Sequence, residues 1–352
     1  MSDFSDTIIN WHRQYGRHDL PWQNTQDPYR IWVSEIMLQQ TQVSTVIPYY
    51  QRFMQRFPDV NNLAQADIDE VLHLWTGLGY YARGRNLHKA ATQIVENFAG
   101  AFPKDIDNMM SLAGIGRSTA GAILSFAFGL RHPILDGNVK RVLSRVFAVE
   151  GWYGKAAVAE QLWQLADEHT PEKDVDVYTQ AIMDFGATLC KRSKPICDEC
   201  PLITNCVAFQ TDRVQEFPGR KPKKKLPTKQ CQMLVVVNQN NQVLIEKRPP
   251  SGIWGGLWCL PQFEIEIDLI DIVRKKLGLN TPSFEDLEMI KHTFSHYHLN
   301  IYPKMVVVDE GDFQLNKVQE ETSIWFDRYK EQKVGLPQPI KKIIADTFAK
   351  LN

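Results

Sequence analysis

The sequence lacks a long hydrophobic run, a secretion signal and a strong net charge. Its longest apolar candidate, Ala120–Leu130, falls short of the ~18–20 residues of a spanning helix, so we expect no contact with a membrane. The acidic N-terminus has no apolar signal core, which predicts a cytoplasmic location. Lys and Arg (40) nearly balance Asp and Glu (41), so no global basic field indicates a nucleic-acid partner.

The length and the hydropathy pattern predict two domains of different fold class. At 352 residues the chain exceeds one ordinary domain. Over residues 1–217 apolar residues recur every three or four positions between glycines and prolines, which predicts an all-α domain of about ten short helices. Acidic residues outnumber basic ones in this half, so contacts with phosphates would come from local basic clusters and backbone amides.

A basic segment follows, and beyond it the spacing of the apolar residues changes from a helical pattern to a strand pattern. Residues 218–230 contain six Lys or Arg and no acidic residue, and together with their prolines they predict a linker. Beyond it, short β-rich runs such as Met233–Val237 predict strands, and Leu269–Leu277 predicts a helix that ends at Gly278. We therefore expect an α+β domain over residues 231–352.

Four of the six cysteines are clustered, with spacings of 6, 2 and 5 residues: Cys190, Cys197, Cys200 and Cys206. Disulfides are rare in a reducing compartment, so clustered thiols indicate a metal site. A closed zinc site more commonly shows two Cys-x2-Cys pairs, and only one is present here. A cubane iron–sulfur cluster also takes four thiolates and is favoured, with zinc and unliganded thiols as the alternatives.

A glycine turn joins two helical runs at Leu112–Gly116. Gly114 and Gly116 let the backbone turn tightly, which directs the amides that open the next helix outward. Such amides, together with the helix dipole, bind a phosphate without cationic side chains. This would let an acidic domain hold DNA; the alternative is a plain corner between two helices.

Two acidic residues are candidates for catalysis. Glu35 stands among Ile, Trp, Val and Met in a helical run, and burial would raise its pKa and make it a general acid. Asp136 precedes a helical run, where its carboxylate could stabilise a cationic transition state. The alternatives are a surface position for Glu35 and a helix-capping role for Asp136.

Taken together, these motifs resemble the helix–hairpin–helix DNA glycosylases: a glycine hairpin, an Asp twenty residues later and the four-cysteine loop 190–206. The resemblance narrows to the adenine glycosylases of the MutY family on four segments: Leu38–Val43, Trp75–Ala82, Ile134–Arg141 and His292–His296. It implies a monomeric enzyme with a [4Fe–4S] cluster that removes adenine mispaired with 8-oxoguanine or guanine in double-stranded DNA. Downstream repair proteins would be its further partners.

The resemblance also implies roles for individual residues. Glu35 would protonate adenine N7 and later help to activate water, and Asp136 would stabilise the oxocarbenium-like sugar. Ser118 and Asn138 would line the pocket and tune these carboxylates. Arg17 and Gln180 would lie near the adenine edge, and Gln40 and Tyr80 would enter the opened duplex. Gly114 and Gly116 of the hairpin would contact the DNA backbone, and Lys140 would be a nearby amine without a required step. The loop that reads 8-oxoguanine would be formed by Phe294, Ser295 and His296.

Three departures from related patterns refine the expectation. Bifunctional relatives of the endonuclease III type carry a lysine nucleophile where this chain has Ser118, so we expect a monofunctional enzyme that uses water. The second domain resembles Nudix hydrolases, but residues 271–278 place cations where carboxylates would bind magnesium, so pyrophosphatase activity is not expected. Ala113 replaces a common hairpin proline. A bifunctional glycosylase/lyase and a non-catalytic iron–sulfur DNA-binding protein remain as alternatives.

Overall fold

The computed structural model describes residues 3–222, 225–277, 282–308, 322–330 and 332–351. They form two compact units, which we call the helical unit (residues 1–65 and 86–223) and the mixed unit (residues 66–85 and 224–352). Within the described ranges, every helix is too short or too polar to span a lipid bilayer.

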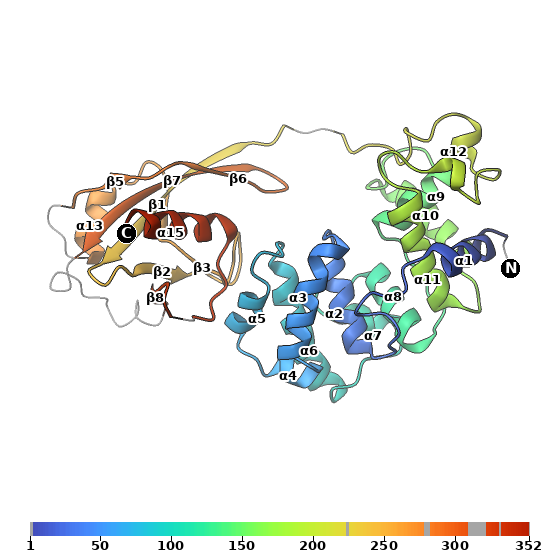
Figure 1. Ribbon diagram of the computed structural model, residues 1–352, viewed down its shortest axis with the longest axis horizontal. Coiled ribbons are helices and arrows are strands. Elements are labelled where there is room, and N and C mark those ends of the chain that lie inside the picture. The colour runs from blue at the N-terminus through green and yellow to red at the C-terminus, as the bar shows by residue number, and fades with distance from the viewer. Residues whose placement is uncertain (1–2, 223–224, 278–281, 309–321, 331, 352) are drawn as a thin grey trace. The chain divides into compact units, whose positions relative to one another are not determined.

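The helices of the first two-thirds of the chain confirm the expected helical fold (Figure 1). They are α1 (Asp3–Tyr15), α2 (Pro28–Leu38), α3 (Val43–Arg56), α4 (Val60–Ala64), α5 (Ile68–Leu74), α6 (Ala82–Phe98), α7 (Ile106–Ser111), α8 (Arg117–Phe128), α9 (Gly137–Val146), α10 (Ala156–His169), α11 (Val175–Asp184) and α12 (Val207–Gln210). A π-helical turn, Phe185–Leu189, continues α11, and a 3-10 turn, Cys197–Glu199, lies in the cysteine loop.

Local sequence explains why α2 begins where it does. The Asp27 carboxylate accepts a hydrogen bond from the Tyr29 amide at 2.9 Å, which satisfies one of the free amides of the first turn. Pro28 occupies the first helical position, where its fixed φ suits the helix and its missing N–H costs nothing. Trp32 and Ile36 are buried on this helix, so its position in the core is fixed, and Glu35 is fixed with it.

The mixed unit is built on one sheet with the order β3-β2-β1-β7-β5 in the described part of the chain. Its strands are β1 (Thr228–Asn238), β2 (Val243–Lys247), β3 (Trp258–Cys259), β4 (Gln262–Phe263), β5 (Glu285–Asp286), β6 (Ile290–Thr293), β7 (His298–Val308) and β8 (Ser323–Phe326). Off this path, β4 pairs with β1, β6 with β7 and β8 with β2. β1 and β7 run parallel from Thr228↔His298 to Asn238↔Val308, and the other pairs are antiparallel. This confirms the expected α+β fold.

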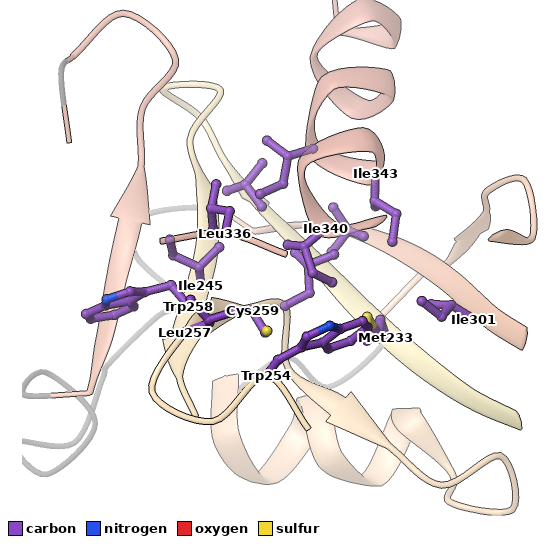
Figure 2. Close-up of a cluster of buried hydrophobic side chains, with 14 of the residues drawn as sticks. Met233, Ile245, Trp254, Leu257, Trp258, Cys259, Ile301, Leu336, Ile340 and Ile343 are labelled. Atoms are coloured by element: carbon purple, nitrogen blue, oxygen red, sulfur yellow. The ribbon is translucent and has the colours of Figure 1, made fainter. Parts of the chain in front are cut away.

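Both faces of β1 are buried, which explains its continuous apolar sequence. Successive side chains of a strand point to opposite faces. Met233 and Val235 face a core that includes Ile340 of α15 (Gln338–Lys350), as Figure 2 shows for Met233 and Ile340. Leu234 and Val236 face a second cluster that includes Val273 of α13 (Leu269–Leu277). A strand covered on both sides reads as an apolar run rather than as an alternation.

The boundaries differ from the expected ones in two places. β1 begins at Thr228, so the end of the expected linker belongs to the sheet. Residues 66–85 belong to the mixed unit because Leu72 is buried in the same core as the sheet residues. The predicted helix over 269–277 is present as α13, while its expected terminator, Gly278, lies outside the described residues.

Candidate active site

Glu35 projects from α2 into a pocket of the helical unit. The pocket has a volume of about 580 Å³, and its lining includes Trp22, Glu35, Phe126 and Gln180. This size lies within the range of roughly 300–1,000 Å³ that is typical of small-ligand sites. Burial, followed by the charge of Asp136, raises the pKa of Glu35 to about 7. The structure therefore gives Glu35 a partly buried position in which its carboxyl group keeps a proton closer to neutral pH than usual.

Asp136 caps α9, and it also acts electrostatically on Glu35. Its Oδ1 accepts hydrogen bonds from the amides of Asn138 (2.9 Å) and Val139 (2.8 Å), and its Oδ2 accepts one from Asn138 Nδ2 at 3.1 Å. Burial raises the pKa of Asp136, whereas these hydrogen bonds and the charge of Arg141 oppose the rise. The charge of Asp136 is the second cause of the raised pKa of Glu35, so the Asp136 carboxylate is near enough to disfavour ionisation of Glu35. The cap and the electrostatic role coexist.

Ser118 and Asn138 support Asp136 from two directions. The hydroxyl of Ser118 accepts a hydrogen bond from the Leu135 amide at 2.9 Å, which fixes the backbone just before Asp136. The side-chain carbonyl of Asn138 accepts a hydrogen bond from Arg141 Nη2 at 2.8 Å. Ser118 therefore holds the chain that carries the carboxylate, a contact that differs from the expected place in the pocket lining.

Arg141 extends this support to the cysteine loop, and the sequence reasoning assigned it no role. Its Nε donates to the Cys190 carbonyl at 2.8 Å, and its Nη2 donates to the Gly186 carbonyl at 2.6 Å. A Cβ at Gly186 would lie 2.6 Å from Asn138 Cβ, so the close approach of the π-helical turn to Asn138 requires glycine. One guanidinium thus connects the Asp136 cap to the first cysteine.

A fully buried carboxylate, Asp184, holds the pocket residue Gln180 and was also missed. It accepts hydrogen bonds from Gln180 Nε2 (2.9 Å) and from the backbone amide (2.9 Å), Nε (3.0 Å) and Nη2 of Arg17. Burial disfavours its charge, but the His12 Nε2 at 3.4 Å from Oδ2 and the hydrogen bonds from Arg17 hold its pKa below the usual value. Both Arg17 and Gln180 were expected near the adenine edge; the structure binds the guanidinium of Arg17 to Asp184 and places Gln180 in the pocket lining.

The backbone requires glycine at Gly114 for reasons that do not apply at Gly116. Gly114 has a φ of +79°, and a Cβ there would lie 2.8 Å from Asn86 Cβ, so both the conformation and the space require glycine. Gly116 has a φ of −93° and open space around it, and it is the N-cap residue of α8 without a side-chain cap. The first amides of α8 therefore lack a capping side chain, as an anion site requires.

Three other residues that were expected to contact DNA are Gln40, Tyr80 and Lys140, and each has its own local environment. Gln40 (φ +57°) and Tyr80 (φ +50°) are both exposed and hold left-handed conformations that non-glycine residues rarely adopt. Such strain is common at functional positions. Lys140 directs its Nζ over the ring of Tyr153, 5.2 Å from the centroid, which gives this amine a structural partner.

Phe294, Ser295 and His296 form the tip of the hairpin between β6 and β7. The Phe294 amide donates to the Tyr297 carbonyl at 2.9 Å, which closes the turn. The ring of Phe294 packs on Trp254 and Tyr297, with centroid distances of 5.4 and 4.9 Å. Ser295 and His296 are exposed, with Ser295 Oγ 3.4 Å from His296 Nδ1. One residue thus anchors the loop and two present polar groups to solvent.

The four clustered cysteines line one pocket with mainly apolar neighbours such as Leu189 and Ile196. Burial first, and then the neighbouring thiols, raise the pKa of Cys197 and that of Cys206; burial also raises the pKa of Cys200, to about 12. Among the described residues, no three His, Cys, Asp or Glu side chains converge on a single ion. Four thiols in one mainly apolar pocket are the donor set of a metal group that binds thiolates.

Arg145 is the buried cation of this loop. Its Nη1 lies 3.3 Å from Cys190 Sγ and donates to the Lys191 carbonyl at 2.8 Å, while its Nε donates to the Phe217 carbonyl at 3.1 Å. A buried guanidinium needs such acceptors on several sides, and it would offset negative charge on the thiolates. The loop is thereby tied to α9, the helix that Asp136 caps.

Comparisons with known proteins show which families the chain is similar to. Residues 33–168 match the model of the HhH-GPD superfamily base excision DNA repair proteins, and residues 232–346 match that of the NUDIX domain. An adenine DNA glycosylase of Buchnera aphidicola (from Schizaphis graminum) is 39% identical over 341 residues, which cover 97% of each chain. The adenine DNA glycosylase of Homo sapiens is 34% identical, over 85% of this chain and 66% of the human one.

Solved structures extend the likeness to the fold. A thermostable thymine-DNA glycosylase aligns with a TM-score of 0.53 and 26% identity over 59% of this chain and 95% of its own. A trapped endonuclease III–DNA covalent intermediate aligns with a TM-score of 0.51 and 21% identity over 59% of this chain and 94% of its own. On these relationships, the chain belongs to the adenine DNA glycosylase family of base excision repair enzymes.

Proposed function

We propose that the protein is a monofunctional adenine DNA glycosylase that hydrolyses the N-glycosidic bond of adenine opposite 8-oxoguanine or guanine in duplex DNA. The observation that carries the proposal is the position of Glu35 in the pocket lining, where burial and the charge of Asp136 raise its pKa to about 7, together with the three hydrogen bonds that hold the Asp136 carboxylate. A neutral acid and an ionised partner in one site are the requirements of glycosidic cleavage.

In the first step, the protonated Glu35 gives its proton to N7 of the adenine. The bond between C1′ and N9 then breaks, its electron pair leaves with the base, and the sugar becomes oxocarbenium-like. The Asp136 carboxylate stabilises that positive charge. Water next attacks C1′ and gives a proton to the Glu35 carboxylate, which restores the acid and leaves an abasic site.

The substrate base must leave the helical stack to reach such a pocket, at a cost that is smallest for a mispair. The amides that open α8, next to Gly116, would hold a backbone phosphate. Gln40 and Tyr80 would contact the opened duplex. The Ser295–His296 tip would read the opposite purine, with Phe294 as its anchor.

Cys190, Cys197, Cys200 and Cys206 would hold a [4Fe–4S] cluster. The four thiols line one pocket, and the presence of only one Cys-x2-Cys pair supports this assignment over zinc. When bound, the cluster would stabilise all four thiolates and so cross-link the loop. Iron and sulfide analysis of the purified protein tests the assignment: four of each are expected per chain, and stoichiometric zinc would contradict it.

Single-turnover assays test the reaction itself. Duplexes would carry adenine opposite 8-oxoguanine, adenine opposite guanine, or thymine glycol, and each would be analysed with and without alkali. We expect adenine release from the first two, strand breaks only after alkali, and no release by Glu35→Gln or Asp136→Asn despite retained duplex binding. Scission without alkali would indicate a lyase, and no base release by the unaltered protein would indicate a binding protein.

A further inference from the structure

Residues 66–85 are built into the core of the mixed unit, although they lie far from the sheet in sequence. Leu72 of α5 is 1% exposed and belongs to the cluster that contains Leu257 and Trp258 (the latter two are labelled in Figure 2). A Cβ at Gly335 would lie 2.9 Å from Leu72 Cβ, so the two segments approach closely. This segment carries Tyr80.

Polar contacts hold the same segment on both sides of Leu72. Asp69 Oδ2 accepts hydrogen bonds from Lys247 Nζ at 2.9 Å and from Trp258 Nε1 at 3.1 Å. The Tyr81 hydroxyl donates to the Leu336 carbonyl at 3.1 Å. A carboxylate that accepts from one charged and one indole donor is a strong and directional anchor. The neighbourhood of Tyr80 is therefore fixed by strands and loops of the mixed unit.

Arg83 fixes Tyr80 within the segment. Its guanidinium lies 5.5 Å from the centroid of the Tyr80 ring and 5.6 Å from that of Trp75. Its Nη2 also donates to the Gly79 carbonyl at 3.1 Å. Because Tyr80 is 54% exposed and has a positive φ, these contacts present its ring to solvent in one strained conformation.

Arg85, one helical position beyond Gly84 on α6, reaches a different loop. Its Nη1 donates to the Gly255 carbonyl at 2.7 Å. The preceding residue, Trp254, is only 7% exposed and has a φ of +55°, which is unusual for a bulky side chain. A strained and buried tryptophan persists only where its surroundings hold it, and the Arg85 bond is part of those surroundings.

Trp254 in turn supports the hairpin tip that carries Ser295 and His296. Its ring centroid lies 5.4 Å from that of Phe294 and 5.7 Å from that of His292, the residues on either side of Thr293. The rings of His292 and Phe294 also meet edge to face at 4.5 Å. Contacts therefore run from the hairpin tip to Trp254 and, through its neighbour Gly255, to Arg85, whose backbone amide donates to the carbonyl of Tyr81, next to Tyr80, at 3.1 Å.

We propose that Arg85 and Trp254 are positioning residues that couple the Phe294–His296 tip to the Tyr80 segment, so that the purine read at the tip sets the position of Tyr80 in the duplex. The inference rests on the proposed function. A contiguous chain of packed groups can carry such coupling, but coupling has to be measured as a free energy between the two ends.

The test compares the rates of adenine release opposite 8-oxoguanine and opposite guanine in single turnovers. We expect Arg85→Met to lower this ratio about fivefold, chiefly by slowing release opposite 8-oxoguanine, because typical couplings begin near that size. Arg85→Lys, which keeps a cationic donor, should restore part of the ratio. Lys89→Met removes the same charge from an exposed position of α6 and should leave the ratio unchanged.

A double-mutant cycle separates coupling from plain damage. Ser295→Ala should lower the ratio in the unaltered protein but have little further effect in Arg85→Met. The proposal would be overturned if the ratio in the double variant fell by the product of the two single effects, or if the ratio in Arg85→Met were unchanged. If Arg85→Met fails to fold by thermal melting, Trp254→Phe provides the same comparison. No release from either duplex by the unaltered protein would instead refute the proposed function.

Discussion

Gln180 donates its amide hydrogen to the buried carboxylate of Asp184 across 2.9 Å. A carboxylate only accepts, so the amide must turn its nitrogen to Asp184 and its oxygen away from it. Gln180 also lines the pocket, and the oxygen is then an acceptor suited to the exocyclic amino group of a purine. Asp184 thus sets which polar group of Gln180 a bound base can meet.

Asp184→Asn should therefore impair both stability and base release. The variant leaves the partly buried Arg17 guanidinium without a charged partner, and breaking a buried pair costs about 3 kcal/mol. Urea denaturation would measure the loss. Asp174→Asn breaks the exposed pair with Arg13 and should change the free energy of unfolding by less than about 1 kcal/mol. Equal effects of the two substitutions would show that Asp184 organises nothing.

The pH dependence of base release should show two limbs. Glu35 must be protonated, so the single-turnover rate should fall as the pH rises through about 7, roughly tenfold per unit beyond it. Asp136 must be ionised, and burial raises its pKa, so the acid limb should lie above the ordinary aspartate range. A rate that stays constant from about pH 6 to 9 would remove Glu35 as the acid.

Glu35 should also lower the free energy of unfolding at neutral and alkaline pH. Its folded pKa of about 7 lies above its ordinary value of 4.5, so the folded state favours the protonated form, and that stabilisation is lost as the pH rises through about 7. Glu35→Gln should therefore raise the free energy of unfolding by about 2–3 kcal/mol near pH 8 and by little near pH 4. The control is Glu96→Gln, an exposed position on α6 that should show no such pH-dependent gain.

Local patterns predicted the elements and several site residues, because their causes are local. The Asp136 carboxylate caps α9 by bonding to amides two and three residues later in the chain. The continuous apolar run in β1 reflects burial of the strand on both faces. The cysteine spacing predicted a metal site, and the four thiols do line one pocket. In each case, the residues that decide the outcome are neighbours in sequence.

Long-range partners could not be predicted in this way. Asp184 meets Arg17 across 167 positions, and Arg141 meets the Cys190 carbonyl across 49, so no local pattern marks either contact. Leu72 shows the same limit, because an apolar position in a helical pattern does not reveal which core will bury it. Arg141 was present in a recognised motif, and an arginine just inside a capped helix is the one signal that could have directed attention to it.

The two hairpin glycines offer a matched pair for testing the phosphate site. Gly114→Ala would place a Cβ at a φ of +79° and 2.8 Å from Asn86 Cβ, so the turn must shift and take the first amides of α8 with it. Gly116→Ala meets nothing within 4 Å at a φ of −93° and removes no side-chain cap.

We expect Gly114→Ala to weaken duplex binding at least about tenfold, since a backbone strain of 1–3 kcal/mol would fall on the phosphate contact. Gly116→Ala should change the affinity less than about threefold, because a φ of −93° is allowed for any residue and the added Cβ meets no atom within 4 Å. Binding isotherms at several salt concentrations would separate the loss of this contact from a general loss of charge, because both variants keep every cation. Equal weakening by the two substitutions would place the phosphate elsewhere on the helical unit.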